Sequence, residues 1–280
     1  MKAGQATGLQ IAFLMFAVML IAVPLTHLVI AHASLEGIPA EIVAKGMHFA
    51  LAIVLIVSVT PLRRFAAREL RAPIRPPGNY ETALVAAANV ALIFAAVGAL
   101  SAWLWVTHGP ERVARLTVDV DSDMAKAFSP TGLVRIVISI FVAPIVEEIV
   151  FRGFVYRAFE RHWGWFASML ATSLLFAVYH PFAWSAFAFS VVCVCILRRT
   201  GSLRAPIVVH TTFNLFLWWP LLGRHVFPTE GDLAEPATWT LQFAGLAFVL
   251  VALPVYVWMS RDRCVVSRTM FLEPNGALSK

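Results

Sequence analysis

Charged residues are scarce in this chain. Asp, Glu, Lys and Arg make up only 14% of its 280 residues, whereas a soluble domain has about 25%. Apolar residues account for 60%, and the mean hydropathy is +0.78. They occur in runs that are too long for the buried strands of a soluble sheet. The composition therefore excludes an ordinary soluble domain and indicates a protein that crosses a membrane several times.

Several familiar sequence signals are also missing. The only cysteines are Cys193, Cys195 and Cys264, so neither a disulfide framework nor a zinc knuckle is expected. The chain lacks the His-Glu-x-x-His pattern of soluble zinc proteases, the Gly-x-Ser-x-Gly turn of serine hydrolases and a phosphate-binding loop. It also lacks the internal repeat that many transporters contain. These absences exclude the common soluble hydrolase and nucleotide-binding classes.

Eight apolar segments are candidates for transmembrane helices. Most approach the roughly 20 residues that cross a bilayer as a helix, although the fifth and sixth are short. We therefore predict an all-α polytopic membrane protein, with about eight transmembrane helices and a conical helical core. In order, the predicted spans are residues 9–30, 46–62, 82–106, 133–150, 163–179, 182–197, 205–222 and 237–259.

The basic residues are distributed asymmetrically between these segments. With the N-terminus in the cytoplasm, 16 Lys and Arg residues fall on the cytoplasmic side and five on the opposite side. This split follows the positive-inside rule and predicts a multi-pass protein of the cell (inner) membrane with both termini cytoplasmic. The net charge of +6 then reflects this orientation and contact with anionic lipid. Because no basic, aromatic-interleaved soluble face exists, nucleic-acid binding is not expected.

The loops divide the chain into three parts. An Arg- and Pro-rich stretch at 63–80 predicts a cytoplasmic linker, so residues 1–79 comprise two N-terminal helices and this linker. Residues 80–259 form a six-helix membrane domain, and residues 260–280 form a polar cytoplasmic tail. Ala31-His32-Ala33 resembles a signal cleavage site. The apolar run before it exceeds the roughly 7–15 residues of a signal peptide, so we expect the first helix to be retained.

Two adjacent glutamates, Glu147 and Glu148, lie at the end of the fourth segment. A charged side chain at the centre of a membrane helix costs roughly 3 kcal/mol on insertion scales, so ionisable residues there mark candidate functional sites. Glu148 and Arg152 are four residues apart and can pair on one helix face. Glu147 points about 100° away from Glu148. A structural ion pair thus accounts for Glu148 and Arg152 but leaves Glu147 available for chemistry.

Two further polar groups lie in apolar surroundings. His180 precedes Pro181 at the end of the fifth segment, and His210 and Asn214 share a face of the seventh. Singly, each group can be a helix cap or a packing contact between helices. Together with Glu147 they form a general-base set, because apolar surroundings make a carboxylate a better base and imidazoles can donate to an oxyanion. The glutamate and both histidines can equally ligate a catalytic zinc ion.

The order of these residues resembles the CAAX protease and bacteriocin-processing family of multi-span intramembrane proteases. The resemblance covers roughly residues 133–222, and it implies an intramembrane endopeptidase. The family includes the prenyl-protein endopeptidases, which cut after a lipidated cysteine. The matching motifs, on successive helices, are Glu147-Glu148-x-x-x-Arg152 followed by Gly153 and Tyr156, then Phe176-x-x-x-His180, then His210-x-x-x-Asn214.

The resemblance also implies a role for each candidate catalytic residue. Glu147 resembles the glutamate that activates the attacking water, and Glu148 and Arg152 resemble its structural partners. The two histidines resemble those that bind the water or the tetrahedral intermediate. Asn214 resembles the amide that stabilises the oxyanion.

The resemblance leaves the cofactor and the biological role open. Family members have been described both as metalloproteases and as metal-free glutamate proteases. A divalent metal such as zinc on Glu147, His180 and His210 is therefore one alternative, although Asn214 in place of a third strong ligand favours the metal-free reaction. The expected partners are anionic lipid and a membrane protein, a lipidated peptide or another peptide as substrate. Two other functions stay open: a non-enzymatic immunity or anchoring factor of the same fold, and a proton-coupled transporter.

The predicted helices do not bring the site residues to one depth. On straight helices, Glu147 and His210 lie about 9 Å and 8 Å from the cytoplasmic face. His180 lies about 26 Å from that face. We therefore expect either a fifth helix that begins later or a broken hairpin with its bend at His180-Pro181. Since non-helical backbone is allowed at depth beside water, we predict a cavity that opens towards the cytoplasm with His180 at its floor.

Overall fold

The computed structural model describes residues 40–74, 76–109, 111, 130–178, 180, 183–217 and 236–262. All secondary structure in this part of the chain is helical, which confirms the predicted all-α class. Two of the elements, named η, are π-helical. The elements are α2 (Ala40–Ser58), α3 (Thr60–Arg71), α4 (Gly78–His108), α6 (Pro130–Val137), η1 (Ile138–Val142), α7 (Ala143–Glu148), η2 (Ile149–Tyr156), α8 (Arg157–Val178), α9 (Ala183–Thr200), α10 (Arg204–Leu217) and α12 (Pro236–Met259).

Three described helices are long and apolar enough to cross a membrane: Gly78–His108, Ala183–Thr200 and Trp239–Met259. They correspond to the predicted third, sixth and eighth spans. A bent pair, Phe49–Ser58 and Leu62–Arg71, makes a fourth if it is one span. The described residues thus do not confirm the predicted number of eight, and the first predicted span lies outside them.

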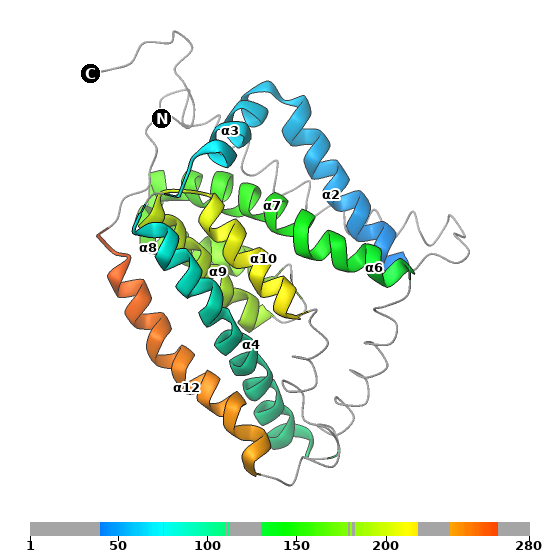
Figure 1. The fold of residues 1–280 in the computed structure, drawn as a ribbon, viewed down its shortest axis with the longest axis vertical. Coiled ribbons are helices and arrows are strands. Elements are labelled where there is room, and N and C mark those ends of the chain that lie inside the picture. Colours follow the sequence, from blue (N-terminus) through cyan, green and yellow to red (C-terminus); the bar gives the residue numbers. More distant parts are fainter. Residues whose placement is uncertain are drawn as a thin grey trace.

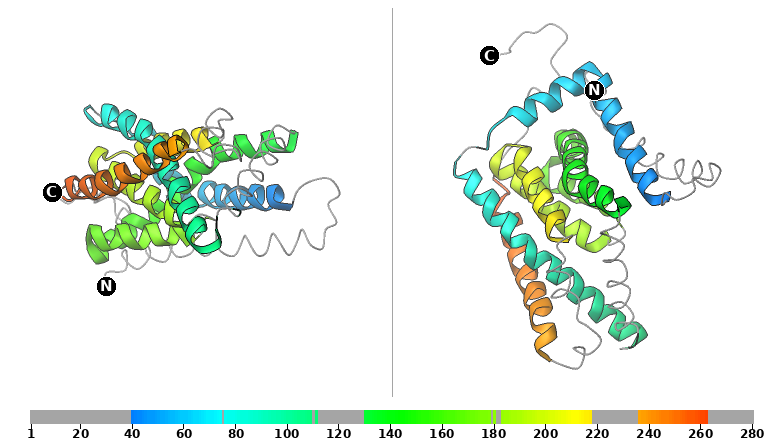
Figure 2. Two further views of the ribbon diagram at one scale, coloured as in Figure 1. Left: turned by 90° about the horizontal axis from the view of Figure 1, so that it is seen from below. Right: turned by 45° about the vertical axis from the view of Figure 1, so that its right-hand side comes forward.

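The helices pack around α9, whose residues from Cys193 to Leu197 have no exposed surface (Figure 1). Helices α4 and α12 run side by side along one edge of the molecule (Figure 2). Their backbones approach closely at two glycines, because a Cβ atom at Gly98 would lie 2.9 Å from the Gln242 carbonyl oxygen and one at Gly245 would lie 2.8 Å from that of Ala91. Gly98 and Gly245 thus allow the two helices to pack closely.

The chain is helical without interruption from Pro130 to Val178, apart from one sharp break at Gly164. Its φ of 73° and ψ of 169° lie in a region that glycine adopts at little cost. The sequence predicted two spans here with a cytoplasmic loop between them at residues 151–162, and the structure makes these residues helical. Arg152 and Arg157 of this predicted loop are buried in helical structure instead.

The break at Gly164 removes the depth problem. Glu147 lies 17 residues before Gly164 and His180 lies 16 residues after it, so both are about 25 Å from the break along two helical arms. The arms fold against each other, and the rings of Phe151 and Phe176 meet with centroids 5.1 Å apart. Of the two expected alternatives, a fifth helix that begins later agrees with the break at Gly164, because Trp163, the predicted start of that span, lies before the break. The second arm ends at Val178, and the next helix begins at Ala183.

The predicted linker at 63–80 is largely helical, because α3 continues to Arg71. This helix packs on η2, where the Phe65 and Phe154 ring centroids are 4.8 Å apart. A Cβ atom at Gly153 would lie only 3.1 Å from the Phe65 ring, so the glycine makes room for that ring. The N-terminal part of the chain is therefore docked on the helix that carries the glutamates.

Candidate active site

The predicted ion pair between Glu148 and Arg152 is present and fully buried, with 3.0 Å between Arg152 Nη1 and Glu148 Oε1. Arg152 Nη2 also donates to the Ser190 carbonyl at 3.4 Å, and the guanidinium lies 4.5 Å above the centre of the Phe176 ring. Glu148 ends α7, and Arg152 lies in the π-helical segment that follows. Such π-helical turns are frequent at functional sites. This ion pair holds the Glu148 carboxylate on the face of the helix that it shares with Arg152.

His210 is oriented by Glu148. Its Nδ1 atom lies 2.8 Å from Glu148 Oε1, and since a carboxylate oxygen in an ion pair with Arg152 is an acceptor, Nδ1 is the donor. In the neutral ring the lone pair is then on Nε2. Asn214, four residues after His210 on the same helix, is not the partner of Nδ1. The structure assigns that contact to Glu148, which comes from a helix 62 residues earlier in the chain.

His180 is held in the same way by its own helix end. Its Nδ1 atom donates to the Phe176 carbonyl at 2.7 Å, and its ring stacks on the Phe176 ring with centroids 4.2 Å apart. A carbonyl oxygen can only accept, so Nδ1 carries the proton and Nε2 carries the lone pair in the neutral ring. Both histidines thus present an Nε2 acceptor.

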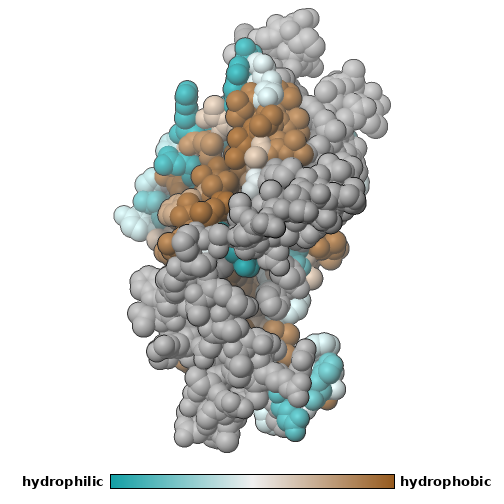
Figure 3. Space-filling view, turned by 90° about the vertical axis from the view of Figure 1, so that its right-hand side faces the viewer, coloured by the Kyte–Doolittle hydropathy of each residue, from teal (hydrophilic) through white to brown (hydrophobic). Residues whose placement is uncertain are grey.

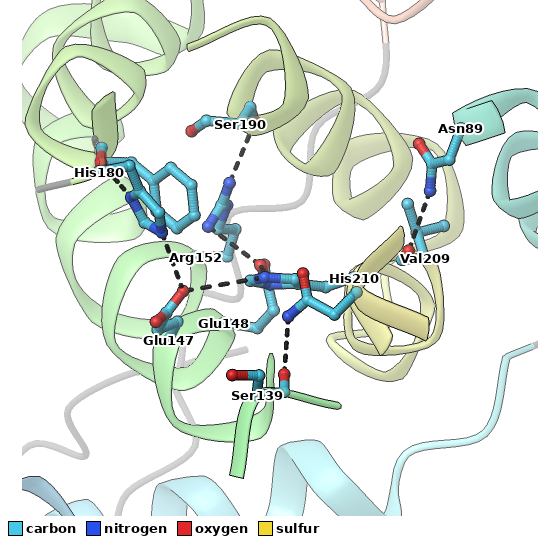
Figure 4. A network of polar contacts seen from close by, with 11 residues as sticks. Asn89, Ser139, Glu147, Glu148, Arg152, His180, Ser190, Val209 and His210 are labelled. Atoms are coloured by element: carbon cyan, nitrogen blue, oxygen red, sulfur yellow. Dashed lines mark hydrogen bonds and ion pairs between the residues drawn. The ribbon is translucent and has the colours of Figure 1, made fainter. Parts of the chain in front are cut away.

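The two Nε2 atoms converge on Glu147 (Figure 4). Each lies 3.8 Å from Glu147 Oε2, and this oxygen has no hydrogen-bond partner among the described residues. A separation of 3.8 Å is too long for a direct hydrogen bond, but a bridging water fits a gap of this kind. Three acceptors that face one another need a proton donor between them, and a water molecule supplies two protons. The arrangement is suited to binding and deprotonating a water.

The same side chains are the candidate ligands of the metal-dependent alternative. The described residues contain no group of three or more His, Cys, Asp or Glu side chains arranged to hold a metal ion. The metal-dependent alternative on Glu147, His180 and His210 stays a prediction. No step of the chemistry below is assigned to a metal.

Asn214 lies one helical turn after His210 and is held by the backbone of η1. Its Nδ2 atom donates to the Ser139 carbonyl at 2.7 Å. The amide oxygen cannot face that carbonyl, so the orientation of the side chain is fixed. Only one of the two N–H groups of the amide is used in this contact, which leaves the other for a ligand.

Exposure differs between the converging groups. The side chain of His180 is 29% exposed, whereas those of Glu147 and His210 are 6% and 4% exposed. His180 lies beyond the end of α8, so one side of its ring is uncovered. The sequence predicted His180 at the floor of a cavity, but it is the outermost of the three. A ligand therefore reaches Glu147 most directly past His180.

Some residues of the site were not identified from the sequence. Phe176, which was noted only as part of a motif, contacts Arg152 and both histidines. Phe189 packs edge-on against His210 with centroids 4.8 Å apart. Asn89 donates to the Val209 carbonyl at 2.9 Å, beside His210 (Figure 4). A buried amide in an apolar helix was the available signal for Asn89.

Replacing Asn89 by Ala is expected to destabilise the protein by about 1–3 kcal/mol, because the buried Val209 carbonyl loses the donor that ties α10 to α4. Thr82→Val is the matched control on the same helix, since the Thr82 hydroxyl donates within its own helix, to Gly78. It is expected to cost less than 1 kcal/mol. Thermal unfolding of the purified variants in detergent measures both changes. Equal losses of stability in the two variants would show that the hydrogen bond between α4 and α10 contributes no more than one within a single helix.

Comparison with known proteins agrees with this geometry. The family model for Type II CAAX prenyl endopeptidase Rce1-like proteins matches residues 129–216, which include all six candidate catalytic residues. The UPF0177 protein YbdI of Lactococcus lactis subsp. lactis (strain IL1403) is 27% identical over 125 residues, which is 43% of this chain and 67% of YbdI. No solved structure matches the chain. The chain thus has helices that are long and apolar enough to cross a membrane, and its segment 129–216 is similar to Rce1-like CAAX prenyl endopeptidases.

Proposed function

We propose that this protein is an intramembrane endopeptidase that hydrolyses a peptide bond near the membrane surface, with a water molecule activated by Glu147. The proposal rests on one observation, the convergence of two imidazole Nε2 atoms on Glu147 Oε2 at 3.8 Å each. The family match supports proteolysis as the reaction class. Because both Nδ1 atoms are already donating, both Nε2 atoms are acceptors, and a water between them and Glu147 can donate to two of these three groups.

In the proposed reaction the water gives one proton to Glu147 while its oxygen attacks the carbonyl carbon of the scissile bond. The carbonyl π bond opens, and a tetrahedral intermediate with one negatively charged oxygen forms. Glu147 then passes the proton to the amide nitrogen, and the C–N bond breaks. The products are a carboxylic acid and an amine, and Glu147 returns to its carboxylate form.

The remaining candidate residues position the water or stabilise the tetrahedral intermediate. The water donates one O–H to Glu147 and the other to the Nε2 atom of one of the two histidines, while the second histidine lines the same site. The second N–H of Asn214 donates to the negatively charged oxygen of the intermediate, as oxyanion-hole amides do. Glu148 holds the tautomer of His210, and Arg152 holds Glu148 in place through the 3.0 Å ion pair. Glu148 and Arg152 thus act through His210 rather than on the substrate.

The substrate class follows from the surroundings of the site. The uncovered side of His180 and the apolar exterior suit a polypeptide that arrives from the membrane, such as a membrane protein or a lipidated peptide. We propose that the protein acts in the cell membrane as a multi-pass enzyme with its termini in the cytoplasm.

The membrane peptidome of the source organism tests the proposal. Cells with the wild-type protein are compared with cells that carry Glu147→Gln at the same abundance. At least one membrane polypeptide is expected to gain a new terminus only in the wild type, and its uncut form is expected to accumulate in the variant. Identical peptidomes, together with no cleavage of any membrane-fraction polypeptide by the purified protein, would contradict a protease.

A further inference from the structure

Helix α3 has two opposite faces. Leu62, Phe65 and Glu69 are buried, and Ala66 lies between them on the same side. At 100° per residue, the direction opposite to this buried side is occupied by arginines. All four of these side chains are exposed, and they are Arg63, Arg64, Arg68 and Arg71.

The buried face of α3 is fixed to the helix of the active site. Phe65 contacts Phe154, and Arg157 Nη2 makes a 2.9 Å ion pair with Glu69 Oε2. The guanidinium of Arg157 also lies 5.4 Å from the centre of the Phe65 ring. With the inner face held in this way, the arginine face points outward from the protein.

The carboxylates at this end of the molecule are already paired with other arginines. Glu69 pairs with Arg157, and Glu81 and Glu160 bond to two arginines at the end of α9. Among the described residues, no carboxylate lies within ion-pair distance of Arg63, Arg64 or Arg71. The outer face of α3 therefore has an excess of positive charge that the described part of the chain does not neutralise.

This charged face directly follows a surface suited to lipid tails. Helix α2 exposes Leu51, Ile53, Val54 and Val57, and the chain then bends by 101° into α3. Figure 3 shows hydrophilic side chains along the upper margin of a hydrophobic surface. If α2 crosses the bilayer, a helix at this angle lies near the plane of the membrane, at the level of the headgroups.

We propose that α3 is an interfacial helix that binds the phosphate headgroups of anionic phospholipids through Arg63, Arg64 and Arg71, with Arg68 at its flank. Guanidinium groups bind phosphate oxygens in a bidentate manner. A cluster of four arginines just beyond an apolar helix is the pattern of a segment that binds anionic lipid. Through Phe65 and Glu69, the bound lipid holds α3 on the π-helical segment that contains Arg152. The binding of lipid does not depend on the proposed proteolysis.

Native mass spectrometry of the full-length protein in detergent tests the proposal with phosphatidylglycerol and phosphatidylcholine at equal concentrations. The wild type is expected to retain phosphatidylglycerol preferentially, and this preference is expected to weaken at high salt. In the triple variant R63Q/R64Q/R71Q the preference is expected to fall at least tenfold, since each surface arginine contributes about fivefold. Because these side chains are exposed, the melting temperature is expected to stay unchanged.

Two further variants make the result specific. R63K/R64K/R71K keeps the charge and is expected to retain most of the preference. Arg261→Gln removes an exposed cation that already pairs with Asp262 at 3.2 Å, and it is expected to change nothing. The proposal is overturned if the glutamine variant keeps the wild-type preference, if the lysine variant loses as much as the glutamine variant, or if Arg261→Gln loses as much as either. Retention of an acidic peptide in place of the lipid would also overturn it.

Discussion

Glu147→Gln is expected to reduce the rate of peptide-bond cleavage by roughly 10³-fold, because the amide cannot take a proton from the attacking water. The same change is expected to leave stability almost intact. Glu147 Oε2 has no hydrogen-bond partner among the described residues, and glutamine has nearly the same shape. A shift in melting temperature of less than about 2 °C is therefore expected.

Two assays on purified protein check this result. One measures turnover of a cleaved membrane polypeptide, and the other follows thermal unfolding in detergent. Asp262→Asn is a matched control, since it makes the same exchange of a carboxylate for an amide at an exposed position outside the candidate site. It is expected to keep full activity. A Glu147→Gln protein that cleaves at the wild-type rate would exclude Glu147 as the base and favour a non-enzymatic role.

Replacing Glu148 is expected to lower stability, in contrast to replacing Glu147. Glu148→Leu leaves the guanidinium of Arg152 buried without its carboxylate, which typically costs about 3–5 kcal/mol. The melting temperature is expected to fall by about 10 °C. Arg152→Met leaves the carboxylate unpaired and is expected to have a similar cost. Thermal unfolding in detergent, with limited proteolysis as a second measurement, detects both losses.

The double variant E148L/R152M separates loss of the pair from loss of packing. Replacing both members of a buried ion pair by apolar side chains is often neutral, so the double variant is expected to recover most of the lost stability. It still lacks the acceptor for His210 Nδ1, so its activity is expected to stay low. Single variants as stable as the wild type would show that the pair contributes little to folding.

The helical class and several helix positions could be predicted from hydropathy. The predicted third, sixth and eighth spans differ from the observed helices α4, α9 and α12 by a few residues at each end. The number of spans could not be confirmed, because length and hydropathy do not show where a helix bends. Gly164 lies in an otherwise helical stretch, and its positive φ depends on the packing of two arms that are far apart in the sequence.

Part of the candidate site could also be predicted. The spacing of four residues between Glu148 and Arg152 was sufficient to predict their pairing. The contact between Glu148 and His210 joins two helices, and no local spacing rule predicts it. The partner of Asn214 is a backbone carbonyl of a π-helical turn, which side-chain patterns do not reveal. The residues that the family resemblance indicated lie close together in the structure. The orientation of their side chains, however, depends on tertiary packing.

The helical hairpin has 17 residues from Glu147 to Gly164 and 16 from Gly164 to His180. These two arm lengths limit where homologous sequences can gain or lose residues. Inserting one residue in a single arm rotates its end by about 100° and moves it by about 1.5 Å. Such an insertion turns either Glu147 or His180 away from the other. Insertions and deletions should therefore be confined to the turn or occur in both arms together. Among homologous sequences, the distance from the glutamate pair to the turn and the distance from the turn to the histidine should vary in step.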